Sequence, residues 1–251
     1  MLNLPPSGLQ EPPPASGKGP HDAPDRLRPL DAFSGSLAQR VYASLREAIL
    51  SIAYRPGEVL RKSEICATLG VSRSPVAEAV ARLQAEALVD VIPQAGTFVA
   101  RFSLDEIREG AFLREALELH AVDQVARTAT PDQIADLRRN LRLQEVLVAE
   151  GDSAGFYRLD AEMHEMILSF TGHRRLPGLA RTAWVHVDRA RQIVLPQPGR
   201  VAATLQEHAA IIDAIAAGDP AAARAATAAH LGQLVTRIER LAADTPDILA
   251  S

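Results

Sequence analysis

The stretch GVSRSPVAEAVARL, from Gly70 to Leu83, places the signals of a sharp turn directly before those of a helix. Gly70 favours the turn, Ser72 is a good N-cap, and Pro75 is tolerated because the amides of a first helical turn have no intrahelical partner. Apolar residues at helical spacing predict the buried side of the helix, namely Val76, Val80, Leu83 and Ala87. The stretch therefore predicts a turn followed by an amphipathic helix.

Elements on both sides of this stretch complete a small domain. Apolar periodicity predicts a first helix from Leu37 to the break at Gly57, and a second short helix covers Arg61 to Leu69. Two β-branched runs, Leu88–Ile92 and Thr97–Ala100, are separated by Pro93–Gly96, whose turn chemistry fits a hairpin. Three helices followed by a hairpin are the layout of a winged helix-turn-helix.

The first turn of the third helix carries polar side chains that can donate hydrogen bonds and that bury no apolar surface. Ser72, Arg73 and Ser74 offer hydrogen-bond donors, and the free amides of the same turn can meet a phosphate. In a winged helix-turn-helix this end of the third helix lies toward the major groove, so we interpret residues 37–102 as a module that binds double-stranded DNA. The alternative is a plain capped helix start, which Ser72 and Pro75 alone would explain.

Three motifs in this region resemble the N-terminal signature of the GntR family of bacterial transcription regulators. They are YRPGEVL (Tyr54–Leu60), LGVSRSPV (Leu69–Val76) and PQAGTFV (Pro93–Val99). The resemblance implies a transcription regulator that binds operator DNA. It also implies DNA contacts by Arg73 and, as weaker candidates, by Arg61, Lys62 and Gly96.

Two positions depart from the family pattern. Ala77 follows the SPV motif where the family usually has arginine, and Ala95 lies at the wing tip where a basic residue is frequent. Each replacement removes a possible phosphate contact. Residues 37–100 contain seven basic and six acidic side chains, a net charge of +1. One copy should therefore attract DNA only modestly, and we expect a homodimer to strengthen binding.

The composition fits a helical protein of the cytoplasm. Aromatic residues make up only 4% of the 251 residues, and abundant Ala, Leu and Arg favour helices over sheets. A single cysteine, Cys66, excludes an internal disulfide and fits a reducing compartment. We recognise neither a signal peptide nor a run of about 18 apolar residues, so we expect a soluble, cytoplasmic protein with no membrane partner. Residues 1–36 are rich in Pro, Gly and Ser and predict a disordered tail.

From residue 103 to 245 we expect an all-α bundle of six or seven helices. Helical patterns are interrupted by short turn signals at 130–131, 151–152, 171–172, 196–199 and 218–220. The wide apolar face that a bundle helix needs is supplied, in the first of these helices, by Ile107, Phe112, Leu113, Leu117 and Val125. The predicted fold class is mostly α, a winged helix-turn-helix followed by an all-α helical domain.

One aspartate and three histidines of this second half have the spacing of a metal site. Asp160 and His164 lie four residues apart, so both side chains face the same side of a helix. His208 lies eleven residues before Asp219 and His230 eleven after it, so in an antiparallel hairpin both stand roughly 16 Å from the turn. The four form an N₃O set for a divalent transition metal (Zn, Ni, Mn or Fe) with open positions. The alternative is a group of core histidines with satisfied hydrogen bonds.

Residues 104–241 resemble the ligand-sensing FCD domain of the FadR subgroup of the same family. In the metal-binding members an Asp and three His hold the ion, matching Asp160, His164, His208 and His230. An open-site metal attracts a small carboxylate or a hydroxy or sugar acid, and such an effector favours a guanidinium partner. Arg114 matches an arginine that is common in these domains, and Arg189 is a second candidate. The alternative for both arginines is a surface salt bridge.

These observations predict a homodimeric repressor or activator whose DNA binding responds to an acid bound at the metal. We expect the acid to release the protein from its operator, the commoner behaviour in this family. Two alternatives remain open. One is a metal-dependent hydrolase with Glu207 or Glu165 as base, although neighbours in a helix point about 100° apart and neither glutamate should face the metal. The other is a DNA-binding regulator with a purely structural metal.

Overall fold

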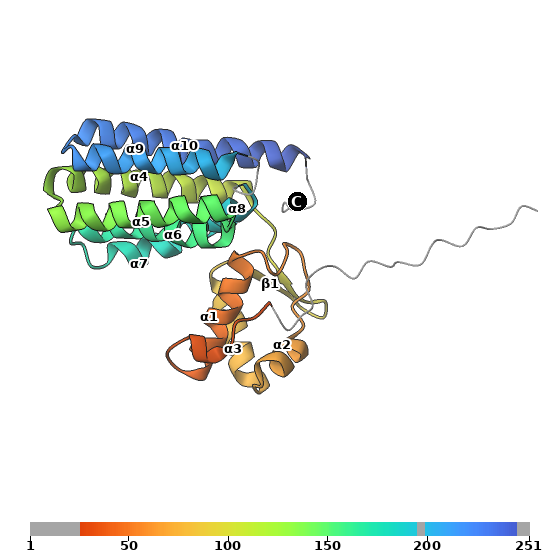
Figure 1. Ribbon diagram of the computed structural model, residues 1–251. Coiled ribbons are helices and arrows are strands. Elements are labelled where there is room, and N and C mark those ends of the chain that lie inside the picture. Colours follow the sequence, from red (N-terminus) through yellow and green to blue (C-terminus); the bar gives the residue numbers. More distant parts are fainter. Residues whose placement is uncertain (1–25, 195–198, 245–251) are drawn as a thin grey trace, which may run out of the picture.

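The computed structural model of this chain describes residues 26–194 and 199–244. A winged domain, which holds α1 to α3 and a hairpin, lies beside a domain of helices (Figure 1). The expected fold class is therefore confirmed. Residues 1–25 of the predicted disordered tail lie outside the described residues. No helix in the described ranges combines the length and the apolar character needed to cross a bilayer.

Three helices form the winged domain: α1 (Leu37–Leu50), α2 (Lys62–Leu69) and α3 (Arg73–Ala85). A capping box begins α1, because the Ser36 hydroxyl accepts from the Gln39 amide and the Gln39 side chain accepts from the Ser36 amide. Gly70 ends α2 in the left-handed conformation, with a φ of 63°, which turns the chain sharply into α3. The turn and the helix predicted from the Gly70–Leu83 stretch are both present.

The wing is a two-stranded antiparallel sheet of β1 (Val89–Ile92) and β2 (Gly96–Val99). Val89 pairs with Val99 and Ile92 with Gly96, as a hairpin requires. One side of this hairpin packs on the helices, so the domain has a single core. Its buried side chains include Val41, Leu45, Ile49, Ile65, Val76, Val80, Leu83, Val89 and Val99.

Two expectations for the winged domain are wrong at the ends of the predicted segments. Ala87 is exposed instead of extending the buried side of α3, because the helix ends at Ala85 and Ala87 has a left-handed backbone with a φ of 53°. Leu88 occupies the buried position instead. The last part of the predicted tail is ordered, since it contains η2 (Leu30–Ala32) and buries Leu27 against the core of the winged domain.

Seven described helices form the helical domain, in agreement with the expected six or seven. They are α4 (Leu104–Thr128), α5 (Pro131–Glu150), α6 (Ser153–Phe170), α7 (Leu176–Ala183), α8 (Val185–Val194), α9 (Arg200–Ala216) and α10 (Pro220–Asp244). Helix α10 packs along α4 and α9, and α5 packs against α6 and α9 (Figure 1). Their shared apolar core includes Val122, Val125, Leu137, Met163, Ile211 and Ile215. The break expected at 196–199 lies largely outside the described residues.

The predicted apolar face of α4 is only partly buried. Ile107 and Val125 lie in the core, but Phe112 is 71% exposed. Helical phase explains the difference, because Phe112 follows Ile107 by five residues and therefore points about 140° away. The side that faces inward in this part of α4 carries Arg114 and Glu118 instead. A charged pair thus occupies a position where we expected apolar packing.

Helix α8 joins the two domains. Val185, at its start, is buried in the core of the winged domain. Arg189 is fully buried, and its Nη2 donates to the Ala100 carbonyl at 2.5 Å. The same guanidinium lies 4.6 Å from the ring centroid of Phe102. The segment between the wing and α4 is therefore fixed to α8.

Gly110 allows α4 and α8 to approach closely, since a Cβ at this position would lie 3.0 Å from Cγ2 of Val187 and 3.4 Å from the Ala183 carbonyl oxygen. We predict that Gly110→Ala lowers the free energy of unfolding by about 1–3 kcal/mol, because these neighbours must move. Gly232→Ala is the matched control, because Gly232 is exposed on α10 with no atom within 4 Å of its Cβ position. At this position alanine should raise the free energy of unfolding by about 0.5–1 kcal/mol, because alanine has a higher helix propensity than glycine. Urea unfolding measures both, and a stabilised Gly110→Ala would contradict the close packing.

Candidate metal centre

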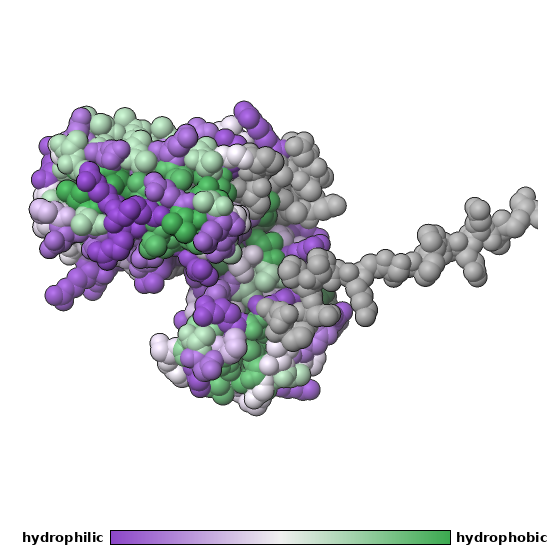
Figure 2. Space-filling view, viewed as in Figure 1, coloured by the Kyte–Doolittle hydropathy of each residue, from purple (hydrophilic) through white to green (hydrophobic). Residues whose placement is uncertain are grey.

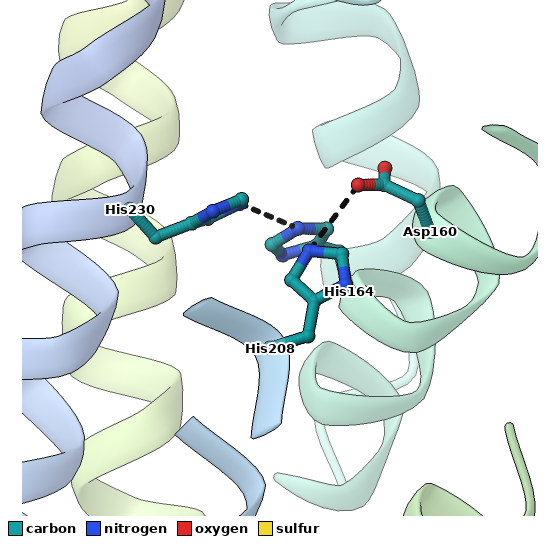
Figure 3. A group of neighbouring side chains, drawn as sticks. All are labelled: Asp160, His164, His208 and His230. Atoms are coloured by element: carbon teal, nitrogen blue, oxygen red, sulfur yellow. Dashed lines mark hydrogen bonds and ion pairs between the residues drawn. The ribbon is translucent and has the colours of Figure 1, made fainter. Parts of the chain in front are cut away.

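Four polar side chains from three helices meet in the core of the helical domain (Figure 3). Asp160 and His164 come from α6, His208 from α9 and His230 from α10. Each offers one ligand atom, and these atoms all lie within 4.8 Å of one another. All four residues are buried. The structure thus brings together the four residues that the sequence predicts as ligands.

Helical geometry explains this meeting. Asp160 and His164 are about one turn apart on α6, so both project from the same side toward α9 and α10 (Figure 3). The turn at Gly218, with a φ of 66°, folds α10 back along α9 and brings the rings of His208 and His230 to a centroid separation of 4.8 Å. The equal spacing of these histidines from the turn is therefore what aligns them.

Each imidazole is held from behind through its Nδ1 atom. Gln144 accepts from His208 and Glu207 from His230, each at 2.7 Å, and Nδ1 of His164 lies 2.7 Å from Oε2 of Glu118 as an ion-pair contact. The Gln144 amide nitrogen donates to Asn140, which leaves the Gln144 oxygen free to accept. Because carboxylate and amide oxygens only accept, Nδ1 of His208 and of His230 carries the proton, and Nε2 of each presents a lone pair.

These Nε2 atoms point toward other acceptors. Nε2 of His164 and of His230 are 3.3 Å apart, and Nε2 of His208 lies 3.2 Å from Oδ1 of Asp160. The buried Nε2 of His208 and Oδ1 of Asp160 have no hydrogen-bond partner among the described residues. Buried acceptors without donors are costly unless a cation lies between them. Three imidazole nitrogens and one carboxylate oxygen fit Zn, Ni, Mn or Fe.

Burial keeps the imidazoles in the form that binds a metal. It holds the pKa of His208 well below the usual value, and the nearby His164 adds to this effect. Burial also lowers the pKa of His230, although the hydrogen bond with Glu207 opposes the shift. Both rings are therefore neutral at neutral pH, and their Nε2 lone pairs are free for a cation.

Three arginine–carboxylate pairs surround the cluster: Arg114–Glu118, Arg191–Asp160 and Arg200–Glu207. Nε of Arg114 donates to Glu118 at 2.7 Å. Burial raises the pKa of Glu118, but Arg114 and His164 outweigh it and leave that pKa at about 2. Arg191 donates to Oδ2 of Asp160, while Oδ1 faces His208. Because the three pairs sum to zero charge, the two charges of a divalent cation would be left for an anion to balance.

A cavity of about 30 Å³ opens beside His230. Its wall includes Arg114, Arg191, Arg200, Thr204 and Arg237. The buried Nε of Arg237 has no hydrogen-bond partner among the described residues. A space of this size holds about two water molecules, and the guanidinium groups around it favour a carboxylate in their place.

The structure does not bring the second effector candidate to the cluster. Arg189 points to Ala100 and Phe102 at the domain junction and does not line the cavity beside His230. Arg191 follows by two residues, which places it about 200° around α8, and it reaches Asp160. The sequence did not single out Arg191. Its spacing of three residues from Asp188 places these two side chains on one face of α8, which differs from the face that carries Arg189. Arg114 is brought to the cluster as expected.

Neither glutamate considered as a hydrolytic base faces the ligand side of the cluster. Glu207 contacts His230 from behind, at Nδ1, and also pairs with Arg200. Glu165 is half-buried and lies 3.8 Å from Arg181. The geometry around the four ligands therefore provides anchoring groups and does not place either carboxylate where a base would act.

All six candidate DNA contacts are exposed on the winged domain. They are Ser72, Arg73, Ser74, Arg61, Lys62 and Gly96. Ser72 occupies the N-cap position of α3, but its side chain makes no capping hydrogen bond. Arg61 forms an exposed ion pair of 3.5 Å with Glu64. The start of α3 and the wing tip are therefore open to a partner.

Comparison with known proteins gives two family matches. Residues 37–99 match the bacterial regulatory proteins of the gntR family, and residues 109–233 match the FCD domain. The first match covers the winged domain, and the second contains all four residues of the cluster.

Similar proteins match most of this chain. An HTH-type transcriptional regulator from an unstable DNA locus of Streptomyces ambofaciens is 34% identical over 84% of this chain and 89% of its own length. The HTH-type transcriptional repressor RspR of Escherichia coli is 26% identical over 83% and 92%, respectively. The crystal structure of a GntR transcriptional regulator from Rhodococcus sp. RHA1 superposes with a TM-score of 0.72 and 28% identity, over 82% of this chain and 99% of that one.

We predict about one equivalent of divalent transition metal per chain, and no tight binding after His208→Ala or Asp160→Ala, because each removes a ligand. Glu207→Ala should lower metal affinity about 10- to 100-fold, because it frees the His230 ring from its anchor. Glu162→Ala, an exposed position on the same helix as Asp160, is the control and should bind metal like the wild type. Elemental analysis and competition with a chelator give the affinities. Unchanged affinity in His208→Ala would rule out this site.

Proposed function

This chain belongs to the GntR family of bacterial regulatory proteins and carries an FCD domain, and we propose that it is a cytoplasmic, homodimeric repressor controlled by a small organic acid that binds at a metal. The observation that carries the proposal is the buried cluster of one aspartate and three anchored histidines, ringed by arginines, in the domain beside the DNA-binding module. The family comprises DNA-binding transcription regulators, so the winged domain is the DNA-binding part.

The start of α3 supports a role in operator binding. Ser72, Arg73 and Ser74 stand exposed at the end of the helix whose amides lack intrahelical partners. An arginine here can pair bidentately with a base edge or a phosphate. We propose that Arg73 supplies the main contact of each copy, with Arg61, Lys62 and Gly96 contributing at the second helix and the wing.

Charge supports an acid as the effector. Since the three arginine–carboxylate pairs are neutral in sum, a bound divalent metal leaves two positive charges in a buried site. The metal, when bound by Asp160, His164, His208 and His230, would offer open positions to a carboxylate or hydroxy acid. Arg114 and Arg191 line the adjoining cavity and would orient that acid. We propose that the acid favours an arrangement of the domains that does not fit DNA, which releases the operator.

Exposed apolar side chains support the homodimer. The helical domain presents apolar (green) patches between hydrophilic residues (Figure 2). Its large exposed apolar side chains within the described ranges are Phe112, Leu113, Leu143, Val146 and Leu179. Apolar surface of this kind is buried in stable assemblies. Two copies would also double the weak positive charge of a single winged domain.

A purely structural metal is the competing interpretation. In that case chelation would destabilise the fold, and acids would bind the metal-free protein as they bind the loaded one. The arginines beside His230 favour the sensing role, because a structural metal with complete coordination needs no guanidinium-lined cavity next to its ligands.

We predict that Arg73→Ala weakens binding to a duplex selected in vitro by the wild-type protein at least tenfold and makes binding less sensitive to salt, because a cationic contact is lost. Arg139→Ala is the control, since Arg139 is an exposed arginine on α5 of the helical domain and its loss changes the net charge equally. Fluorescence anisotropy at several salt concentrations measures both. Equal affinities of the two variants would remove Arg73 from the interface.

A screen of small carboxylates and hydroxy acids by thermal shift tests the sensor. An acid at about 100 times its dissociation constant should stabilise the metal-loaded protein by about 2.7 kcal/mol, and His230→Ala or prior chelation should abolish the gain. The same acid should weaken operator binding in a gel-shift titration. Stabilisation that persists after chelation would favour the structural metal, and a tightened operator complex would reverse the sign of the response.

A further inference from the structure

We propose that Arg46, on α1 of the winged domain, is part of the acid-binding site and that the preferred ligand is a dicarboxylate whose second carboxylate pairs with this arginine. The proposal rests on the proposed function, since it assigns the far end of the acid whose near end lies at the metal. It places one contact of the effector on the DNA-binding domain itself.

The first observation behind this proposal is a cavity between the domains. It has a volume of about 150 Å³, and its wall includes His164 and Arg114 of the helical domain, Arg46 of the winged domain, and Arg181, Trp184 and Arg191. A metal ligand and a side chain of α1 therefore share one space. The cavity adjoins a wider cleft of about 800 Å³ between α1 and helices α6 and α8, whose wall also includes Arg46, Asp160 and Arg191. A ligand can thus reach the cluster from solvent through the junction of the domains.

The charges on the cavity wall carry the second step. Four guanidinium groups line the cavity, from Arg46, Arg114, Arg181 and Arg191. The acids on the same wall are Asp188, which lies 3.6 Å from Arg191, and Glu165, which lies 3.8 Å from Arg181. Neither acid pairs with Arg46 or Arg114, whose partners, Glu86 and Glu118, lie outside the cavity wall, so both guanidinium groups can also face a ligand in this space. Two separated cations select a ligand with an anionic group at both ends.

The hydrogen bonds of Arg46 carry the third step. Its Nε donates to Oε2 of Glu86 at 3.0 Å, and its Nη2 lies 3.5 Å from the Arg181 carbonyl oxygen. Glu86 is the C-cap residue of α3, and the Tyr42 hydroxyl also contacts it. A carboxylate in the cavity would compete with Glu86 for the Arg46 guanidinium. Ligand binding would then act on the C-terminal end of α3, the helix whose N-terminal end we expect to meet DNA.

Isothermal titration of the metal-loaded, full-length protein tests this assignment. The probes are succinate, glutarate and adipate, each compared with the monocarboxylate of the same carbon count (butyrate, valerate and hexanoate). At least one dicarboxylate should bind tenfold or more tightly than its partner. Arg46→Gln should remove that advantage and leave the monocarboxylate affinity unchanged. Arg28→Gln is the matched control, because Arg28 lines the wider cleft and pairs with Glu47, but does not line the 150 Å³ cavity that contains His164 (the inner cavity).

A second variant separates ligand binding from support of the fold. Glu86→Gln frees the guanidinium without removing it, so dicarboxylate affinity should stay equal or rise. If Glu86→Gln weakens the dicarboxylate as much as Arg46→Gln does, Arg46 only holds α3 and the assignment is overturned. Equal binding of dicarboxylates and monocarboxylates by the wild type also overturns it, while the metal-bound acid of the proposed function stands. Failure of both acid classes to bind the metal-loaded protein would instead reject the proposed function.

Discussion

Three imidazoles and a carboxylate that meet in a buried core constrain this molecule more than any other feature. An acceptor at Nδ1 fixes the rings of His208 and His230, so Nε2 of these two rings has no proton to share with its neighbours, and Nδ1 of His164 lies 2.7 Å from Glu118. Hydrophobic packing of α6, α9 and α10 holds the four groups within 4.8 Å of each other despite the repulsion. A cation between these atoms would relieve that repulsion.

Two routes of packed side chains connect the four-residue cluster to the winged domain. Arg191 of α8 shares Asp160 with the cluster, and Arg189 of the same helix binds the Ala100 carbonyl and Phe102 after the wing. One short helix therefore contacts both a metal ligand and the segment that connects the domains. The inner cavity offers the second route, through Arg46 to Glu86 at the end of α3. The acid can change operator binding only if it binds two arrangements of the domains with different affinities. The contacts along both routes can produce such a difference in affinity.

Local patterns in the sequence predicted more of this structure than did inferences about distant contacts. Gly70 and the donors after it defined α2 and α3, and the spacings of Asp160, His164, His208 and His230 placed all four on the correct sides of their helices. The anchors of the rings could not be found in this way, because Glu118 and Gln144 lie on α4 and α5 and meet the cluster only through tertiary packing. Phe112 was misplaced because periodicity gives the phase of a helix only when its inward face is apolar, and in this part of α4 that face carries Arg114. Nothing in the sequence indicated which face of α8 Arg189 occupies, since two faces of that helix are buried against different domains.

X-ray absorption spectroscopy at the edge of the metal that copurifies with the chain tests the central claim most directly. The account predicts a shell of three imidazole nitrogens and one carboxylate oxygen at about 2.0–2.2 Å for zinc, with the remaining positions filled by light atoms that change when an acid is added. A spectrum without imidazole scattering, or one that shows only oxygen ligands, would mean that the metal lies elsewhere on the protein and would contradict the account.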